Sequence, residues 1–251
     1  MESFFLLEGI IGALGLLTAA IGIFMGIFFS FLIKKSGNRS KGTIIGFVGG
    51  LMLAIVCFDL LPEAFEIGSI YISIIGILLG LTLSVFLDGS LAHNSKLSTK
   101  DNKTRFLKAA ILMAIGIGIH NIPSGVALGS LLATNTVKGL HLGVALIIHG
   151  IPEGLAIGIF LREGNVKTIL TIIIAMLTSI PMGLGSALGG VVSKISEGMV
   201  CMSLTFAAGM ILYIIYRETL PSARDTWKGR LSTIGNVLGM VAGMLIVACT
   251  H

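Results

Sequence analysis

Residues 139–161 read GLHLGVALIIHGIPEGLAIGIFL, a continuous apolar run in which Glu153 is the single charged residue. A helix rises about 1.5 Å per residue, so a run of about 20 residues can cross roughly 30 Å of hydrocarbon. Outward from this run in both directions, comparable runs recur between charged segments, and none alternates in polarity as a membrane strand would. The sequence therefore predicts an all-α, polytopic membrane protein with eight transmembrane helices, near residues 9–33, 42–61, 67–87, 109–133, 139–161, 168–192, 198–216 and 231–250.

The composition agrees with a protein embedded in the lipid bilayer and leaves little chain for any other domain. Of the 251 residues, 55% are hydrophobic and 12% are charged, against about 25% charged in soluble domains. The mean hydropathy is +1.01. We expect a single membrane transport domain over residues 1–251, with the polar segment 88–108 as a cytoplasmic loop. The formal net charge of +5 lies in short loops without interleaved aromatic residues, which argues against nucleic acid as a partner.

The basic residues are distributed unevenly between the two sets of loops. Of the 17 lysines and arginines, all but Lys138 and Lys194 lie in or beside the first, third, fifth and seventh connections. Cytoplasmic loops of membrane proteins carry an excess of Lys and Arg, so this pattern predicts that both chain termini lie outside the cytoplasm. The membrane that we expect is the cell (plasma) membrane. The alternation also favours an even number of spans.

Two pairs of segments repeat each other along the chain. Residues 50–62 and 209–221 align at a constant offset of 159, which superposes Gly50 on Gly209, Asp59 on Glu218 and Pro62 on Pro221. A second pair joins the predicted fourth and fifth spans, with HNIPSG at 120–125 and HGIPEG at 149–154. The members of each pair run in opposite directions. The sequence therefore predicts inverted repeats, which in secondary transporters place the substrate site near the midplane of the membrane.

Three side chains in the second pair have the chemistry of a metal site. His120 and His149 each lie about halfway along a predicted span, near the bilayer centre. Glu153 is the single acidic residue inside the third to sixth spans, where a charge costs at least about 2.5–3.5 kcal/mol. His149 and Glu153 are four residues apart and therefore share a helix face. Two imidazoles and a carboxylate suit Zn²⁺ with an open fourth position.

The prolines beside these histidines leave a structural alternative open. Pro123 and Pro152 disrupt the backbone hydrogen bonds to the carbonyls of Ile119 and Ile148. In a membrane these carbonyls must find partners in protein or in a hydrated cavity. The alternative to a metal site is a pair of kinked helices whose histidines bond across the bundle.

Glycines recur at intervals of four residues in several spans and favour close helix packing. One such stripe could also serve as the face of a homodimer. The stripes are Gly125/Gly129, Gly150/Gly154/Gly158, Gly185/Gly189 and Gly235/Gly239/Gly243.

At these residues the chain resembles the ZIP (Zrt/Irt-like protein) metal transporters, especially a prokaryotic branch of that family. The resemblance rests on His-Asn-x-Pro-x-Gly in the fourth span, Pro-Glu-Gly in the fifth, and eight spans in a three-two-three inverted-repeat arrangement. It implies an inward carrier of Zn²⁺ and similar divalent ions. The primary metal site that it implies consists of His120, His149 and Glu153, with Met52 and Asn121 as further ligands.

The resemblance also implies a path for the metal near the membrane surfaces. Asp59, Glu63 and Glu218 are candidates for this path, although each can equally be read as an interfacial charge. His141 is a further candidate.

The sequence departs from the family pattern at a second metal position. Relatives with a two-metal centre carry acids or amides where this chain has Ser124, Gly150 and Met182, and of these Ser124 alone offers an oxygen, a weak ligand. Two dications a few ångströms apart repel strongly unless anions bridge them. We therefore predict a single ion per chain. Its predicted ligands are His120, His149, Glu153 and either water or Met52.

A metal ion transporter is the leading hypothesis, with the metal as transported substrate, no cofactor and no enzymatic activity. The alternatives are a secondary transporter for another substrate and an intramembrane metalloprotease. Gly150 occupies the position at which the HExxH signature of metalloproteases carries its glutamate, which disfavours the protease. Fe²⁺, Mn²⁺, Co²⁺ and Cd²⁺ suit ligand sets that overlap with those of Zn²⁺. The sequence leaves open the metal, the coupling ion, the oligomeric state and the choice between carrier and channel.

Overall fold

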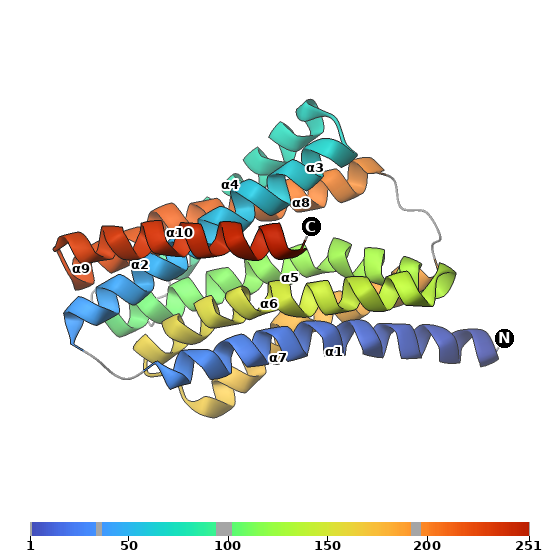
Figure 1. The fold of residues 1–251 in the computed structure, drawn as a ribbon, viewed down its shortest axis with the longest axis horizontal. Coiled ribbons are helices and arrows are strands. Elements are labelled where there is room, and N and C mark those ends of the chain that lie inside the picture. The colour runs from blue at the N-terminus through green and yellow to red at the C-terminus, as the bar shows by residue number, and fades with distance from the viewer. Residues whose placement is uncertain (1, 34–36, 94–101, 192–196, 251) are drawn as a thin grey trace.

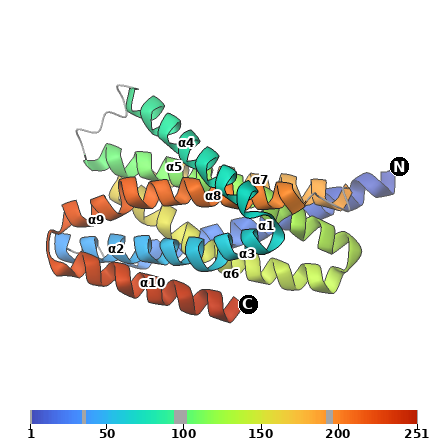
Figure 2. The ribbon, with the colours of Figure 1, turned by 90° about the horizontal axis from the view of Figure 1, so that it is seen from above.

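The helices of a computed structural model lie roughly along one long axis, and α4 runs obliquely to the others (Figures 1 and 2). The structure describes residues 2–33, 37–93, 102–191 and 197–250. Within these residues it contains helices and no strand. The α-helices are α1 (Glu2–Leu32), α2 (Asn38–Ile55), α3 (Leu61–Ile67), α4 (Ile70–His93), α5 (Asn102–Thr134), α6 (Thr136–Glu163), α7 (Thr168–Val191), α8 (Glu197–Ile214), α9 (Leu220–Thr226) and α10 (Arg230–Thr250).

Eight helical stretches of the described chain are long and apolar enough to cross a membrane, which confirms the predicted number. Two of them are composite. A π-helical turn, η1 (Val56–Leu60), joins α2 to α3, and a second, η3 (Ile215–Thr219), joins α8 to α9. These spans run on to residues 67 and 226 rather than ending near 61 and 216 as the sequence predicted. The reason is that Pro62 and Pro221 lie in the first turn of α3 and α9, directly after the π turns. A proline is tolerated in a first helical turn because its missing N–H is not needed there, so the chain continues as helix.

The predicted loop 88–108 is helical at both ends. Residues 88–93 belong to α4 and residues 102–108 to α5, while 94–101 lie outside the described residues. Asp88 and Lys108 form an ion pair and are 7% and 1% exposed. Charges that suggested a solvated loop are therefore paired with each other between two helices.

The spans pack as two groups of four (Figure 1). The first bundle consists of α1, α5, α6 and α7, and the second of α2, α4, α8 and α10 together with the short helices α3 and α9. Glycines allow the closest approaches. A Cβ atom at Gly154 would overlap the carbonyl of Ile23 in α1, and one at Gly50 would overlap the carbonyl of Asn236 in α10.

The helix contacts are compatible with the predicted inverted repeat. Gly50 of α2 lies against the backbone of Asn236 in α10, and Gly209 of α8 lies against the backbone of Ile77 in α4. The offset of 159 relates Gly50 to Gly209 and Ile77 to Asn236, so the two contacts correspond to each other. The composite spans share the order α, π, α at the same offset. Helix α2 packs on α10 as α8 packs on α4, and α6 packs on α1 as α5 packs on α7.

The glycine stripes are used inside the chain. Gly235, Gly239 and Gly243 lie against Thr43, Phe47 and Leu51 of α2, respectively. The other stripes meet α1, α5 or α7. These stripes therefore serve packing between helices of one chain, and none of them supplies a face for a second copy.

Candidate metal centre

The repeat of α5 and α6 brings the two histidines together. Both helices continue through an internal proline, Pro123 in α5 and Pro152 in α6. The rings of His120 and His149 have centroids 5.7 Å apart and an interplanar angle of 43°. One ligand atom each from His120, His149 and Glu153 lies within 4.8 Å of the others. Such a group of nitrogens and oxygen is compact enough to surround one divalent cation.

Within the described part of the chain, each of the two imidazoles has one ring nitrogen without a hydrogen bond. Among the described residues, Nδ1 of His120 and Nε2 of His149 are buried without a hydrogen bond. A buried polar atom left unpaired costs about 1–3 kcal/mol. His149 does bond across the bundles through its other nitrogen, Nδ1, which lies 3.1 Å from Oδ2 of Asp59, whereas Nε2 of His149 and Nδ1 of His120 stay available to a ligand. His120 and Glu153 are 4% and 3% exposed.

Asp59 of η1 fixes the orientation of His149. Its Oδ2 lies 3.1 Å from Nδ1 of His149, while Nε2 of the same ring lies 3.6 Å from Oε1 of Glu153. If Nδ1 carries the proton that faces Asp59, Nε2 presents a lone pair toward Glu153 and His120. Carboxylates commonly orient metal-binding imidazoles in this way. The sequence placed Asp59 on a path near the surface; the structure places it directly behind a candidate ligand.

A cavity of about 260 Å³ leads to the histidines from one end of the molecule. This end, here called the terminal end, holds residues 68–69 between α3 and α4 and residue 135 between α5 and α6. The cavity lies between the two bundles. Its polar lining comprises Asp59, Glu63, His120, Ser124 and His149, and Glu63 is exposed, so the cavity reaches the surface there. His141 is exposed near the start of α6 and does not line this cavity.

A second, much smaller cavity of about 10 Å³ adjoins the three candidate ligands. It is lined by Asn121, Ser124, Gly150 and Met182, among others, and has about the volume that a single water requires. The Asn121 amide nitrogen donates to the carbonyl of Thr178, 3.0 Å away. The Ser124 hydroxyl donates to the carbonyl of His120 at 3.4 Å. Both polar side chains are thus near the candidate ligands but bonded to backbone.

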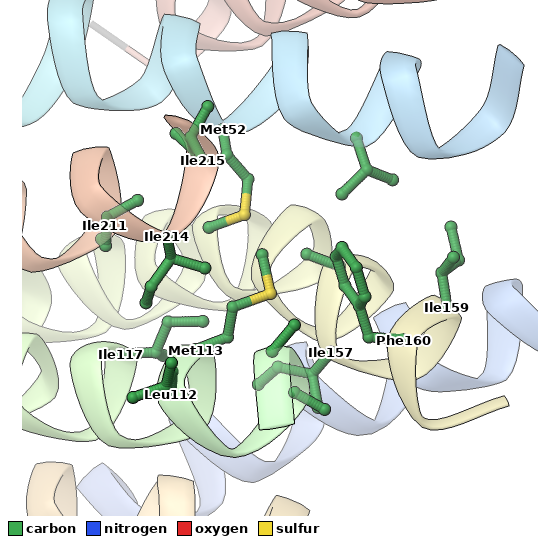
Figure 3. Packing of buried hydrophobic residues seen from close by; sticks show 14 of the residues in the cluster. Met52, Leu112, Met113, Ile117, Ile157, Ile159, Phe160, Ile211, Ile214 and Ile215 are labelled. Carbon is green, nitrogen blue, oxygen red and sulfur yellow. The ribbon is translucent and has the colours of Figure 1, made fainter. Parts of the chain in front are cut away.

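Met52 lies away from these cavities. It is 3% exposed within an apolar cluster between the bundles, and its side chain extends from α2 toward α5, where Met113 lies (Figure 3). Met52 thus belongs to an apolar cluster and lines neither cavity, and its role as a metal ligand stays a prediction. The cluster fills the space between the bundles with buried apolar side chains. Those labelled in Figure 3 are Met52, Leu112, Met113, Ile117, Ile157, Ile159, Phe160, Ile211, Ile214 and Ile215.

Glu218 also lies away from the histidines, at the opposite end of the molecule. This end, here called the basic end, holds the last residues of α1, α4, α6 and α9 and the first residues of α2, α5, α7 and α10. Glu218 is 4% exposed, and its Oε2 lies 3.4 Å from Nε of Arg105. Sequence reasoning missed Arg105, Lys108 and Asp88 because it assigned them to a loop. The signal was an acid just after one apolar run and a base just before the next.

An eight-span helical protein with a cavity that leads to a buried His/His/Glu group has the design of a polytopic membrane transporter for cations. The sequence profile of the ZIP zinc transporter family matches residues 87–250. The chain belongs to this family, in a prokaryotic branch, and it is a multi-pass membrane protein of a family of transporters rather than enzymes.

Bacterial relatives align with most of the chain. The zinc transporter ZupT of Escherichia fergusonii is 29% identical over 246 residues, which cover 92% of this chain and 94% of the relative. The zinc transporter ZupT of an Enterobacter species is 30% identical over 247 residues, with the same coverage. That of Salmonella heidelberg is 30% identical over 138 residues, 52% of each chain.

Proposed function

We propose that this chain transports divalent transition metal ions, with Zn²⁺ as the principal substrate, through a site formed by His120, His149 and Glu153. The observation that carries the proposal is the buried group of three ligand atoms within 4.8 Å of one another. Two nitrogens of its imidazoles have no hydrogen bond within the described part of the chain. A dication there offsets the buried carboxylate and occupies the unpaired nitrogens. Membership of the ZIP zinc transporter family and the zinc transporters among its relatives support Zn²⁺.

The proposed direction of transport is toward the cytoplasm. The exposed basic side chains of the basic end, among them Lys167, Arg224, Lys228 and Arg230, favour its location on the cytoplasmic side of the plasma membrane. The terminal end then faces outward, with both chain termini outside. Its cavity presents Glu63 and Asp59 to an arriving cation, and carboxylates attract dications before they reach the histidines.

The proposed site holds one ion. Glu153 is the single carboxylate among the residues that line the small cavity. A Cβ atom on Gly150 would lie 3.2 Å from Cα of Gly22, so α1 occupies the space that a longer side chain would need. The fourth ligand is then water from the outward cavity rather than Met52. The glycine stripes that suggested a homodimer face pack against other helices of the same chain, so the homodimer stays a prediction with no face assigned to it.

The test is uptake of Zn²⁺, Fe²⁺, Mn²⁺, Co²⁺ and Cd²⁺ by liposomes that contain the purified protein. We expect Zn²⁺ uptake by the unmodified chain and its loss in Glu153→Ala and His149→Ala. Glu66→Ala is the matched control, because Glu66 is an exposed acid of α3 outside both cavities. Near-normal uptake by a folded Glu153→Ala protein would refute the site. Metal-independent flux of another solute would favour a different secondary transporter.

A further inference from the structure

Ion pairs join the two bundles at the basic end. Lys108 of α5 pairs with Asp88 of α4. Arg105 of α5 pairs with Glu218 of η3 at 3.4 Å and with Asp225 of α9 at 2.6 Å. In a further pair, Nζ of Lys41 in α2 lies 2.8 Å from Oε2 of Glu163 in α6. Each of these pairs has one member in each bundle.

Lys108 is the most deeply buried of these charges. It is 1% exposed and ranks with Phe160 among the largest fully buried side chains. A buried ammonium is costly unless a carboxylate compensates it. Membrane-embedded lysines are therefore rare and usually functional. The burial of Lys108 calls for an explanation that packing alone does not give.

The second bundle holds a preformed socket for this ammonium. Asp88 accepts a hydrogen bond from the Tyr213 hydroxyl at 2.9 Å, and its Oδ2 lies 3.5 Å from Nε of Arg217. Asp88, Tyr213 and Arg217 all belong to the second bundle. Lys108 is the member of this group that comes from the first bundle. The socket can therefore stay intact when the two bundles move relative to each other, while the Lys108 contact cannot.

The two ends of the interface between the bundles differ. At the terminal end the bundles are separated by the cavity that leads to the histidines. Next along the axis comes the apolar cluster around Met52 and Met113, and beyond it the ion pairs. A path for metal through the basic end would have to part the same surfaces that Lys108 and Arg105 hold together. Alternating access in transporters occurs by movement of one bundle against the other.

We propose that Lys108 in its Asp88 socket, supported by Arg105 and Lys41, is a clamp that keeps the basic end closed while the cavity at the terminal end is open. The inference rests on the proposed transport function. Lys108 is a positioning residue: it acts on the arrangement of the bundles and does not touch the metal. Release of the ion at the basic end requires Lys108 to leave its socket. The clamp therefore sets the equilibrium between the state open at the terminal end and the state open at the basic end.

The experiment measures access to the two sides of the apolar cluster in a chain whose native cysteines are replaced by serine. Ala127→Cys reports on the terminal end, because Ala127 is exposed and lines the cavity of about 260 Å³ that leads to the histidines. Ile211→Cys reports on the basic side, because Ile211 is 3% exposed in the apolar cluster. The rate of reaction with a hydrophilic maleimide is measured for each reporter in purified protein in nanodiscs, without added metal.

In the unmodified background we expect fast labelling at Ala127→Cys and slow labelling at Ile211→Cys. Adding Lys108→Met should lower the first rate and raise the second, each by about fivefold or more, the lower range of typical conformational coupling. Lys108→Arg should restore both rates toward the original values. Lys167→Met is the matched control, because Lys167 is an exposed base at the same end with no ion pair among the described residues. It should leave both rates unchanged.

Opposite changes at the two reporters support the clamp. Unchanged rates in a folded Lys108→Met protein overturn it, and so do rates that rise together, since those indicate general loosening. If Lys108→Met does not fold, Asp88→Asn is measured instead, because it keeps the side-chain shape and removes the charge that holds Lys108. The same two criteria then apply. Because the readout needs no transport, a failure of zinc uptake in the unmodified chain would overturn the proposed function and leave the clamp to be judged by labelling.

Discussion

Residues 56–67 and 215–226 have the same backbone and opposite surroundings. Each consists of a π turn followed by a short helix that begins before a proline, and each places an acid at the same point, Asp59 or Glu218. Asp59 faces His149 of α6, beside an open cavity. Glu218 faces Arg105 of α5, in a closed interface. Beyond the acid, α3 carries Glu63 and Glu66, whereas α9 carries Arg224 and Asp225.

This difference shows that the repeat determines where the two acids lie, and that the neighbouring bundle determines which side chain each acid contacts. An acid beside an imidazole orients a ring for a cation from outside the protein. The same acid beside a guanidinium is already paired with a cation of the chain itself. A structure with one end open and the other closed therefore arises from equivalent backbones, through the partner that each acid meets. Four experiments test how far this contrast extends.

The largest expected effect concerns the sidedness of the two ends. Cysteines are introduced singly at Lys167, at the basic end, and at Val137, at the terminal end, in a chain without native cysteines. Both positions are exposed. An impermeant maleimide applied to intact cells should label Val137→Cys and leave Lys167→Cys unlabelled until the membrane is opened. The reverse pattern would mean that the acidic cavity faces the cytoplasm.

The next effect separates the two acids directly. Asp59→Asn should weaken Zn²⁺ binding by about 10–100-fold, as is typical when the group that orients a metal-binding imidazole is lost. Glu218→Gln should change the Kd much less, because Glu218 lies across the apolar cluster from the histidines. Isothermal titration of purified protein measures both, with Glu66→Gln as the control. Equal losses for Asp59→Asn and Glu218→Gln would contradict the assigned roles.

A third experiment asks whether the backbones are as equivalent as the contrast assumes. Gly50→Ala and Gly209→Ala each place a Cβ atom against a neighbouring helix carbonyl, of Asn236 and Ile77 respectively. Overpacking of this kind costs about 1–3 kcal/mol, so both variants should unfold at lower temperature in detergent by similar amounts. Gly89→Ala is the control, because a Cβ atom there meets nothing within 4 Å. Destabilisation of one variant alone would show that the halves pack differently.

The smallest effect concerns the number of ions. Elemental analysis of the purified chain should give one Zn²⁺ per protein, and two well-occupied adjacent ions would refute the single-ion proposal. Ser124 lines both cavities beside the candidate ligands. Ser124→Glu adds a carboxylate that can offset a second dication, so the stoichiometry should rise toward two. Ser124→Gln, with a similar shape and no charge, should stay at one.

The fold could be predicted from the sequence wherever apolar length was the controlling property. Eight long runs gave eight spans because hydrocarbon thickness sets the length of a helix. The ends were less predictable: the sequence predicted ends near 61 and 216, whereas the π turns before Pro62 and Pro221 allow each helix to continue. The boundary at 88–108 was wrong for a different reason. Asp88 and Lys108 are polar as separate residues, and their mutual compensation exists only in three dimensions.

The candidate site was likewise predictable where it depends on local sequence, and not where it depends on contacts between distant helices. His120, His149 and Glu153 were found from depth and helical spacing, which are local properties, and the structure places them together. The position of Met52 depends on how α2 rotates against α5, and this rotation cannot be read from the sequence of α2. The contact of Asp59 with His149 likewise joins two bundles across the cavity. Sequence reasoning therefore reached the residues of α5 and α6 and not the way in which the second bundle meets them.

The apolar cluster between the histidines and the basic end has a consequence for the energy balance of a cell. Protons and alkali ions cross membranes along continuous files of water, and a constriction lined by Ile, Met and Phe side chains excludes such a file by dewetting. With the cavity open on one side, we expect the cluster to keep the membrane electrically tight. A cell can therefore hold many copies of this protein in its membrane without discharging the potential on which its other transporters depend.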